Sequence, residues 1–186
     1  MKRMTWRMRT QWMMVVSMIQ LLLIAGPLWR RKITWNVKDV SYGQPFISIF
    51  PSMMNLSIFF WNCQGVSSPG FKSTFKTVSK IYKPDIVAIL EPKVSGAKAD
   101  YFIKGSGFEF SHRVEAEGFV GGIWILWNKG FALEFVINHK QYIHFKVTDF
   151  SGNWSWVTAA YASPNPNLRR KFWNELESIA KSIKGP

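Results

Sequence analysis

LSIFFWNCQGVSSPGFKSTFKTVSKIYKPDIVAILE, residues 56–91, is the stretch that decides the fold. It opens at 56–61 with a short apolar and aromatic run, which is typical of a buried strand. A turn signal follows, then apolar residues at helical spacing, and then a helix end at Lys83-Pro84. A second apolar run occupies residues 85–90. This order of strand, helix and strand predicts a βαβ unit whose two strands are parallel.

The helix predicted within this unit has two different faces. Its apolar residues recur from Phe71 to Tyr82, whereas Lys72, Lys76 and Lys80 form another face. One interpretation of the lysines is a solvated helix surface. The other is contact with a DNA backbone, because neutralising phosphates needs only clustered cations.

Beyond residue 91 the sequence is dominated by strand patterns. The predicted strands lie at 108–114, 122–127, 131–137, 143–149 and 154–161. Short turns at 128–130 and 151–153 separate some of them, and such connections are expected between antiparallel neighbours. Apolar residues at positions i, i+4, i+8, i+11 and i+15 from Leu168 predict a final amphipathic helix. We therefore expect a mixed α+β fold with one helix before the run of strands and one after it.

The composition limits the class of protein. Hydrophobic residues make up 47% of the 186 residues and aromatic residues 16%, so the chain can bury a core. The formal net charge of +13 favours a polyanionic partner, either nucleic acid or an anionic membrane surface. Cys63 is the single cysteine, which excludes an internal disulfide and any multi-cysteine zinc site. We interpret it as a small apolar residue beside a strand end.

We divide the chain into a basic and apolar leader, residues 1–53, and a domain, residues 54–186. The first 54 residues hold eight Lys and Arg residues against one acid, Asp39. Residues 12–29 form an apolar run at the lower length limit of a membrane-spanning helix. Four interpretations stay open: a membrane anchor that contacts the bilayer through residues 12–29, a signal peptide, an organelle transit segment, or an inert leader. An inert leader predicts a nuclear or cytoplasmic protein, and a targeting segment predicts a membrane or organelle location.

Three polar residues directly follow apolar strands: Asn62, Glu91 and Tyr161. The parallel strands of a βαβ unit bring Asn62 and Glu91 to one sheet edge, where α/β folds bind ligands. A carboxylate suits Mg²⁺, an amide can orient a ligand or water, and a phenol can hydrogen-bond a phosphate oxygen. Each also has a structural interpretation, as a turn cap, a solvated acid and a core tyrosine with a wet hydroxyl.

The segment WNCQG at 61–65 resembles the first motif of the endonuclease/exonuclease/phosphatase superfamily. More closely, it resembles the endonuclease region of plant LINE-type (non-LTR) retrotransposon reverse transcriptases. The match continues in order along the chain, through residues 83–87, 90–93, 118, 121–127, 156–161, 163–164 and 169–173. It covers approximately residues 54–183, which correspond to the N-terminal half of the family's domain.

The resemblance implies a two-sheet β-sandwich flanked by helices, and Mg²⁺-dependent nicking of DNA. Glu91 corresponds to the metal-binding carboxylate, and Asn62 to the amide that supports the metal and phosphate site. Tyr161 corresponds to the hydroxyl that contacts the scissile phosphate. Gln64 stands where many relatives carry Arg, and Pro92 where many carry Thr. No small-molecule cofactor is implied.

The family's later Gly-Asp-Phe-Asn and Ser-Asp-His segments do not occur in this sequence. His112, His139 and His144 do not match the missing histidine, and we interpret them as structural or surface residues. We therefore expect a truncated and catalytically incomplete endonuclease domain in which Mg²⁺ binding is weak or lost. Alternatives are a non-enzymatic, basic nucleic-acid-binding protein and a small membrane-anchored or secreted protein. The sequence leaves the oligomeric state open.

Overall fold

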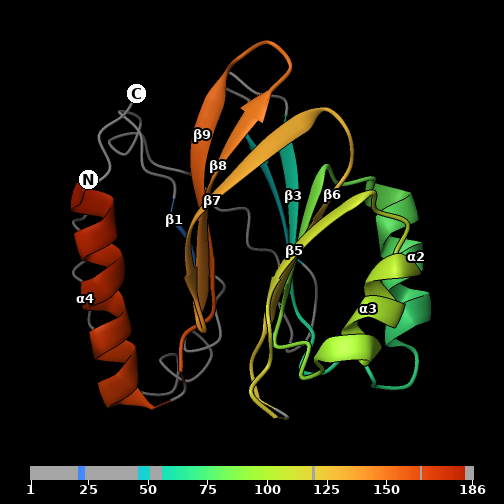
Figure 1. Cartoon of the computed structure of the whole chain (residues 1–186), viewed down its shortest axis with the longest axis horizontal. Coiled ribbons are helices and arrows are strands. Elements are labelled where there is room, and N and C mark those ends of the chain that lie inside the picture. Colours follow the sequence, from blue (N-terminus) through green and yellow to red (C-terminus); the bar gives the residue numbers. More distant parts are fainter. Residues whose placement is uncertain (1–20, 24–45, 51–55, 119, 164, 183–186) are drawn as a thin grey trace, which may run out of the picture.

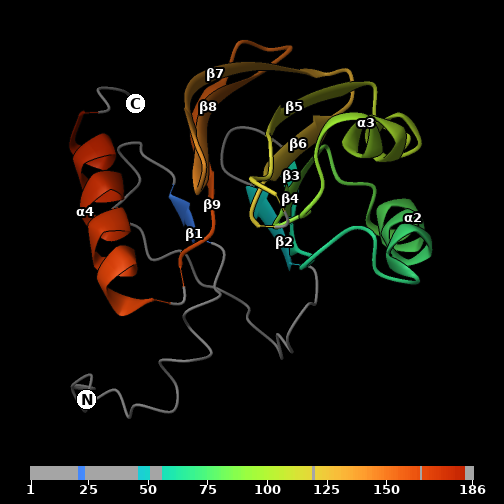
Figure 2. The same ribbon diagram turned by 60° about the horizontal axis from the view of Figure 1, so that its bottom comes forward.

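The computed structural model describes residues 21–23, 46–50, 56–118, 120–163 and 165–182, the first two segments by their backbone alone. It shows a mixed α+β architecture of two β-sheets with helices on both outer sides. Figure 1 shows the layers edge-on, in the order helix, sheet, sheet, helices, and Figure 2 shows the same order from a second direction. The sequence prediction of a two-sheet sandwich flanked by helices is therefore confirmed.

The five-stranded sheet contains the βαβ unit. Its strand order is β2-β3-β4-β6-β5. The strands are β2 (Phe46–Phe50), β3 (Leu56–Asn62), β4 (Ile86–Leu90), β5 (Phe110–Val114) and β6 (Ile123–Trp127). β3 and β4 are parallel, as predicted, and the other neighbours in this sheet are antiparallel.

The four-stranded sheet has the order β1-β9-β8-β7 and is antiparallel throughout. Its strands are β1 (Leu21–Leu23), β7 (Phe131–His139), β8 (Tyr142–Asp149) and β9 (Trp154–Ala160). β8 and β9 are joined by a tight turn, in which the Asp149 carboxylate accepts hydrogen bonds from the backbone N–H groups of Ser151 (2.8 Å) and Asn153 (2.9 Å).

Three described helices cover the outer faces of the two sheets. Helices α2 (Phe71–Tyr82) and α3 (Gly96–Lys104) lie on the five-stranded sheet, and α4 (Pro166–Ser182) lies on the four-stranded sheet. α2 ends where Lys83 adopts a left-handed backbone conformation (φ 45°) and Pro84 cannot continue the helix. The amphipathic patterns predicted for α2 and α4 are confirmed, since each helix buries two large apolar side chains toward its sheet.

The apolar side chains form three packed groups, one for each interface between layers. The largest group lies between the two sheets and includes Phe60 and Phe145. A second group packs the five-stranded sheet against α2 and α3, where Trp61 contacts Phe71 at a ring-centroid distance of 4.6 Å. The third group packs α4 against the four-stranded sheet through Phe172. Burial of these side chains is the main stabilising contribution to the layered arrangement.

A reciprocal hydrogen-bonded pair fixes the starts of β3 and β4 relative to each other. The Asp85 carboxylate accepts hydrogen bonds from the backbone N–H (2.8 Å) and the hydroxyl (2.7 Å) of Ser57. In return, the backbone N–H of Asp85 donates to the Ser57 hydroxyl (3.1 Å). The pair lies at the opposite end of these strands from Asn62 and Glu91.

Two expectations from the sequence were wrong. Helix α3 was not predicted, so two helices rather than one precede the long run of strands. In addition, the short turn at 128–130 does not join antiparallel neighbours, because β6 belongs to the five-stranded sheet and β7 to the four-stranded sheet. The chain therefore passes from one layer of the sandwich to the other at this turn.

Two short strands lie within the predicted leader. β1 pairs with β9, and β2 pairs with β3, so parts of residues 1–53 contribute to both sheets. Apart from residues 21–23, the apolar run at 12–29 lies outside the described residues, and the boundary between leader and domain stays a prediction. Among the helices of the described segments, none combines the length and the apolar character needed to cross a membrane.

Candidate functional site

Asn62 and Glu91 meet at the carboxyl ends of the two parallel strands. Asn62 is the last residue of β3 and lies opposite Leu90, the last residue of β4, so that Glu91 follows immediately at the same edge. The Nδ2 group of Asn62 donates a hydrogen bond to Oε1 of Glu91 at 3.3 Å. The structure therefore brings these two predicted site residues into direct contact.

A second hydrogen bond fixes the orientation of the Asn62 side chain. The backbone N–H of Gln64 donates to Oδ1 of Asn62 at 3.3 Å. The amide of Asn62 thus accepts from the following turn and donates toward Glu91, as short polar side chains at strand ends commonly do. Asn62 is also nearly buried, with an exposed fraction of 8%. Its amide is held in place before any ligand arrives.

The backbone around Glu91 adopts a conformation that is unusual for residues other than glycine. Glu91 has a φ of 54°, and Lys93 has a φ of 57°. Their N–H groups donate to the carbonyl oxygens of Gly122 (3.0 Å) and Gly121 (3.1 Å), respectively. Left-handed backbone costs about 1–3 kcal/mol in such residues and persists only where surrounding contacts enforce it. Here the loop that leads into β6 supplies those contacts.

Lys93 places a cation beside the carboxylate. Its Nζ lies 3.7 Å from Oε2 of Glu91, and both side chains are partly exposed (36% and 21%). Reasoning from the sequence assigned Lys93 no role. The sequence spacing did indicate such a contact, because a lysine two residues after a strand-end carboxylate can fold back onto that carboxylate in a turn.

Tyr161 reaches the same region from the other sheet. It directly follows β9, and its hydroxyl donates a hydrogen bond to the carbonyl oxygen of Lys140 at 2.9 Å. Burial is the largest cause that raises the pKa of Tyr161 to about 12, and the negative charges of Glu91 and Glu117 contribute to the same rise. The hydroxyl lies against Gly121, whose carbonyl oxygen accepts a hydrogen bond from the Lys93 N–H, so Tyr161 lies near the Glu91–Lys93 turn although its own hydrogen bond goes to Lys140.

The single cysteine, Cys63, is engaged in packing. The thiol of Cys63 lies 3.5 Å from the carbonyl oxygens of Leu90 and Glu91, and burial raises its pKa to about 12. A neutral, partly buried thiol with a raised pKa is a poor nucleophile, which agrees with the interpretation of Cys63 as a packing residue.

The three histidines make contacts within or between strands. His144 is buried, with Nδ1 2.8 Å from the Thr158 hydroxyl, and burial lowers its pKa. Nε2 of His112 lies 2.7 Å from Oδ1 of Asn138, and His139 packs on Tyr142 at a centroid distance of 4.6 Å. None of these contacts involves Asn62, Glu91 or Tyr161.

The side chains at this sheet edge are of the types that bind Mg²⁺, but together they carry little negative charge. A hard cation prefers oxygen ligands such as the Glu91 carboxylate and the Asn62 amide oxygen, with water completing the shell. Across the described segments, however, no group of three His, Cys, Asp or Glu residues could hold a metal ion together. The Lys93 ammonium also competes for the Glu91 carboxylate. Glu91 and Asn62 therefore offer oxygen atoms of the kind that Mg²⁺ prefers, with one carboxylate between them.

Comparisons with known proteins give distant similarity to solved structures alone. No family model matches the sequence, and no curated protein matches it. Among solved structures, the chain is similar to the crystal structure of AP endonuclease LMAP from Leishmania major, with 13% sequence identity and a TM-score of 0.47. The similarity covers 68% of this chain and 49% of that structure, so the chain spans about half the length of its structural relative.

Proposed function

We propose that this chain carries the incomplete site of a Mg²⁺-dependent DNA endonuclease of the endonuclease/exonuclease/phosphatase type, related to LINE-type retrotransposons, and that it does not cleave DNA itself. The observation that supports this best is the hydrogen bond from Asn62 to Glu91 at the carboxyl ends of two parallel strands. The motifs at 61–65 and 90–93 that carry the family resemblance meet at this contact.

Each polar group of the site has a distinct role toward a phosphodiester. Glu91 would hold Mg²⁺ together with Asn62, and the bound ion would polarise a phosphoryl oxygen. Asn62 keeps the Glu91 carboxylate in place through its fixed amide. The Lys93 ammonium adds a positive charge beside the anionic substrate.

Tyr161 would act as a hydrogen-bond donor. With a pKa of about 12 its hydroxyl stays protonated throughout the neutral range. It can therefore donate to a phosphate oxygen but cannot serve as a base near neutral pH. Donation to a substrate requires the hydroxyl to turn away from the Lys140 carbonyl that accepts its hydrogen bond in this structure.

The proposal that the chain is inactive rests on the missing base. Hydrolysis needs a group that removes a proton from the attacking water, and such a group typically contributes about 10²–10⁴-fold to the rate. The described histidines are committed to contacts elsewhere, and Glu91 is engaged by Asn62 and Lys93. A site that lacks members of a cooperating set loses most of its activity.

A plasmid-nicking assay with Mg²⁺ or Mn²⁺ tests the inactivity. We expect nicking by the purified chain to equal that of its Glu91→Gln variant, since neither completes the reaction. Nicking by the wild-type chain that Glu91→Gln abolishes would disprove inactivity. Equal nicking by both proteins above the buffer blank would identify a contaminating nuclease, which a further purification step removes.

Metal binding at the site is tested separately, with Mn²⁺ as a paramagnetic probe. In a ¹⁵N-labelled chain we expect Mn²⁺ to broaden the NMR signals of the Asn62 side-chain amide and the backbone amides of residues 91–93. Glu91→Gln should remove this local broadening, whereas Glu134→Gln, an exposed change on β7, should not. Absence of local broadening in the wild-type chain at millimolar Mn²⁺ would contradict the proposed metal site.

A further inference from the structure

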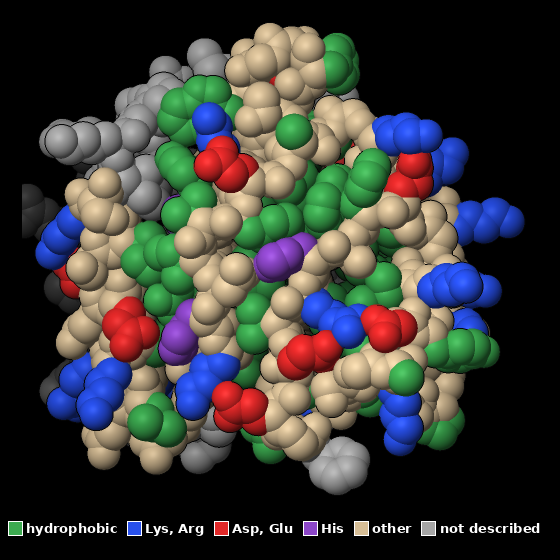
Figure 3. All heavy atoms as spheres, viewed as in Figure 1, with side chains coloured by type: hydrophobic (Ala, Val, Ile, Leu, Met, Phe, Trp, Pro, Cys, Tyr) green, Lys and Arg blue, Asp and Glu red, His purple; other side chains and the backbone are tan. Residues whose placement is uncertain are grey.

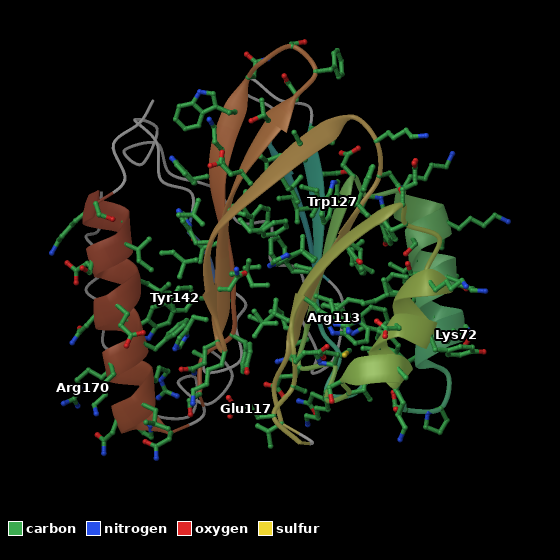
Figure 4. All side chains as sticks on the ribbon, in the orientation of Figure 1. Lys72, Arg113, Glu117, Trp127, Tyr142 and Arg170 are labelled. Atoms are coloured by element: carbon green, nitrogen blue, oxygen red, sulfur yellow. The ribbon has the colours of Figure 1, made fainter. Side chains whose placement is uncertain are left out.

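The helical layer on the five-stranded sheet presents an unusually basic surface, which we call the lysine face. All of its side chains are exposed, and they come from α2, from the residue that ends it, and from α3. They are Lys72, Lys76, Lys80, Lys83, Lys98 and Lys104. Figure 3 shows Lys and Arg side chains projecting along the side of the molecule formed by α2 and α3, and Figure 4 places Lys72 on this side.

The positive charge of the lysine face is not compensated by described neighbours. α2 contains no acidic residue. α3 contains one, Asp100, and its carboxylate pairs with Arg113 of β5. None of the ion pairs formed among the described residues involves a lysine of this face. A solvated helix surface usually mixes both signs of charge, so this one-sided arrangement favours an anionic partner.

The spacing of the lysines matches an extended anion. Lys72, Lys76 and Lys80 recur every four residues, which places them in one row along α2 about 12 Å long. Duplex DNA carries one negative charge per about 1.7 Å of its axis, so this row faces several phosphates at once. Nζ of Lys72 also lies 4.8 Å from the ring centroid of the exposed Tyr101, which connects the row to α3.

The buried side of α2 argues against an anionic membrane as the partner. A helix that binds a bilayer surface inserts an apolar face into it. The apolar face of α2 is already occupied, because Phe71 and Phe75 are buried against Trp61 and Phe102. Ile81 and Tyr82 are exposed at the C-terminal end of α2, but over the preceding turns the helix can present only its charged face.

We propose that the lysine face binds the phosphate backbone of double-stranded nucleic acid, without base specificity and without metal. The lysine face is distinct from the Asn62–Glu91 site, since none of its lysines contributes to that site. Binding through it does not require that the site bind metal or cleave.

Fluorescence anisotropy with a labelled DNA duplex of about 20 base pairs tests this, with chelator present and the salt concentration varied. The test variant is the triple change Lys72→Gln, Lys76→Gln and Lys80→Gln. The matched control, Lys129→Gln, Lys171→Gln and Lys181→Gln, removes the same charge from other exposed positions. Circular dichroism should show that both variants are folded.

We expect the wild-type chain to bind two duplexes of unrelated sequence equally well, with an affinity that falls steeply with salt. The lysine-face variant should bind roughly tenfold more weakly or worse at low salt, and the slope of log affinity against log salt should decrease in magnitude by about 3. The control variant should lose much less affinity for the duplex. Because chelator is present throughout, the result does not depend on metal binding at the Asn62–Glu91 site, which separates this proposal from the fate of the nuclease site.

Three results would overturn the proposal. One is absence of salt-dependent duplex binding by the wild-type chain, and the second is equal weakening by the two triple variants. The third comes from sedimentation with vesicles that contain phosphatidylserine: a lysine-face variant that loses vesicle binding while keeping duplex binding would assign the surface to a membrane.

Discussion

The hydroxyl oxygen of Tyr161 occupies the space that a Cβ atom on Gly121 would need. Gly121 has a φ of 75° and precedes β6 of the five-stranded sheet, whereas Tyr161 follows β9 of the four-stranded sheet. The two layers therefore touch through a glycine that can carry no side chain without displacing the phenol. This contact keeps Tyr161 on the side of the molecule where Glu91 lies.

Gly121→Ala should destabilise the chain and displace Tyr161. The new methyl group would clash with the hydroxyl, and alanine at positive φ costs about 1–2 kcal/mol in addition. The free energy of unfolding, measured with urea, should fall by more than for Gly152→Ala, whose φ is 82° and whose Cβ would meet nothing within 4 Å.

The same substitution should be better tolerated in a Tyr161→Phe background. Removing the hydroxyl leaves the ring carbon Cζ as the nearest atom, at 3.6 Å from the Cβ position, which is ordinary contact. We expect a favourable coupling of about 1 kcal/mol or more in the double-mutant cycle. Additive effects would show that the hydroxyl does not lie against Gly121.

Tyr161 should make stability depend on pH above neutrality. Its pKa in the folded chain is raised from 10.0 to about 12, so folding favours the protonated phenol. The resulting stabilisation is fully present below pH 10 and is lost as the pH rises through about 12. Unfolding monitored from pH 8 upward should show this loss, and Tyr161→Phe should reduce it. Identical curves for both proteins would contradict it.

Glu91→Gln should lower the pKa of Tyr161 without restoring its ordinary value. The Glu91 charge is one cause of the raised pKa, but burial is the larger one and is unchanged by the substitution. Absorbance titration of the phenol, with Tyr161→Phe subtracted, measures the pKa. Glu134→Gln serves as the control, and an equal pKa in wild type and Glu91→Gln would show that the two groups are too far apart to interact.

Asp85→Ala should destabilise the chain by about 1.5–3 kcal/mol, because the Ser57 backbone N–H and hydroxyl both lose a charged acceptor. Ser57→Ala should cost less, since the backbone N–H of residue 57 still reaches the carboxylate. Urea unfolding of the two variants checks this order. A larger loss for Ser57→Ala would indicate that the hydroxyl matters more than the carboxylate.

His144 should weaken the fold in mild acid. Burial lowers its pKa below the ordinary 6.5, so the unfolded chain binds a proton more readily than the folded one. The stabilisation is present above pH 6.5 and is lost as the pH falls below that value. His144→Gln should reduce this part of the pH dependence of thermal unfolding, whereas His139→Gln should leave it in place.

Much of the five-stranded sheet could be predicted from the sequence. The runs at 56–61 and 85–90 are apolar apart from Ser57 and Asp85, and one strongly amphipathic helix separates them. The residue spacing, the lengths of the runs and their order along the chain therefore all indicate the same strand-helix-strand arrangement. Helix α3 was not predicted, because it has only nine residues, begins at Gly96 and buries just Ala99 and Phe102. So short and weakly patterned a segment gives little helical signal.

The assembly of the site could be predicted only in part. The meeting of Asn62 and Glu91 follows from parallel strands, which the sequence indicates directly. The approach of Tyr161 depends on the passage from β6 to β7 between the sheets, and a short turn normally indicates strands of one sheet. The fit of its hydroxyl against Gly121 depends on packing between layers, which local patterns do not encode.

The passage of the chain between layers at 128–130 has a mechanical consequence. Asn62 and Glu91 belong to the five-stranded sheet, whereas Tyr161 follows a strand of the four-stranded sheet. Any sliding of one sheet over the other therefore changes the distance between the phenol and the carboxylate. We therefore expect the pKa of Tyr161 to depend on how the two sheets are aligned. A ligand that contacted both sheets would fix that alignment. Separation of the two sheets would disrupt the site even while the strands of each sheet stayed paired.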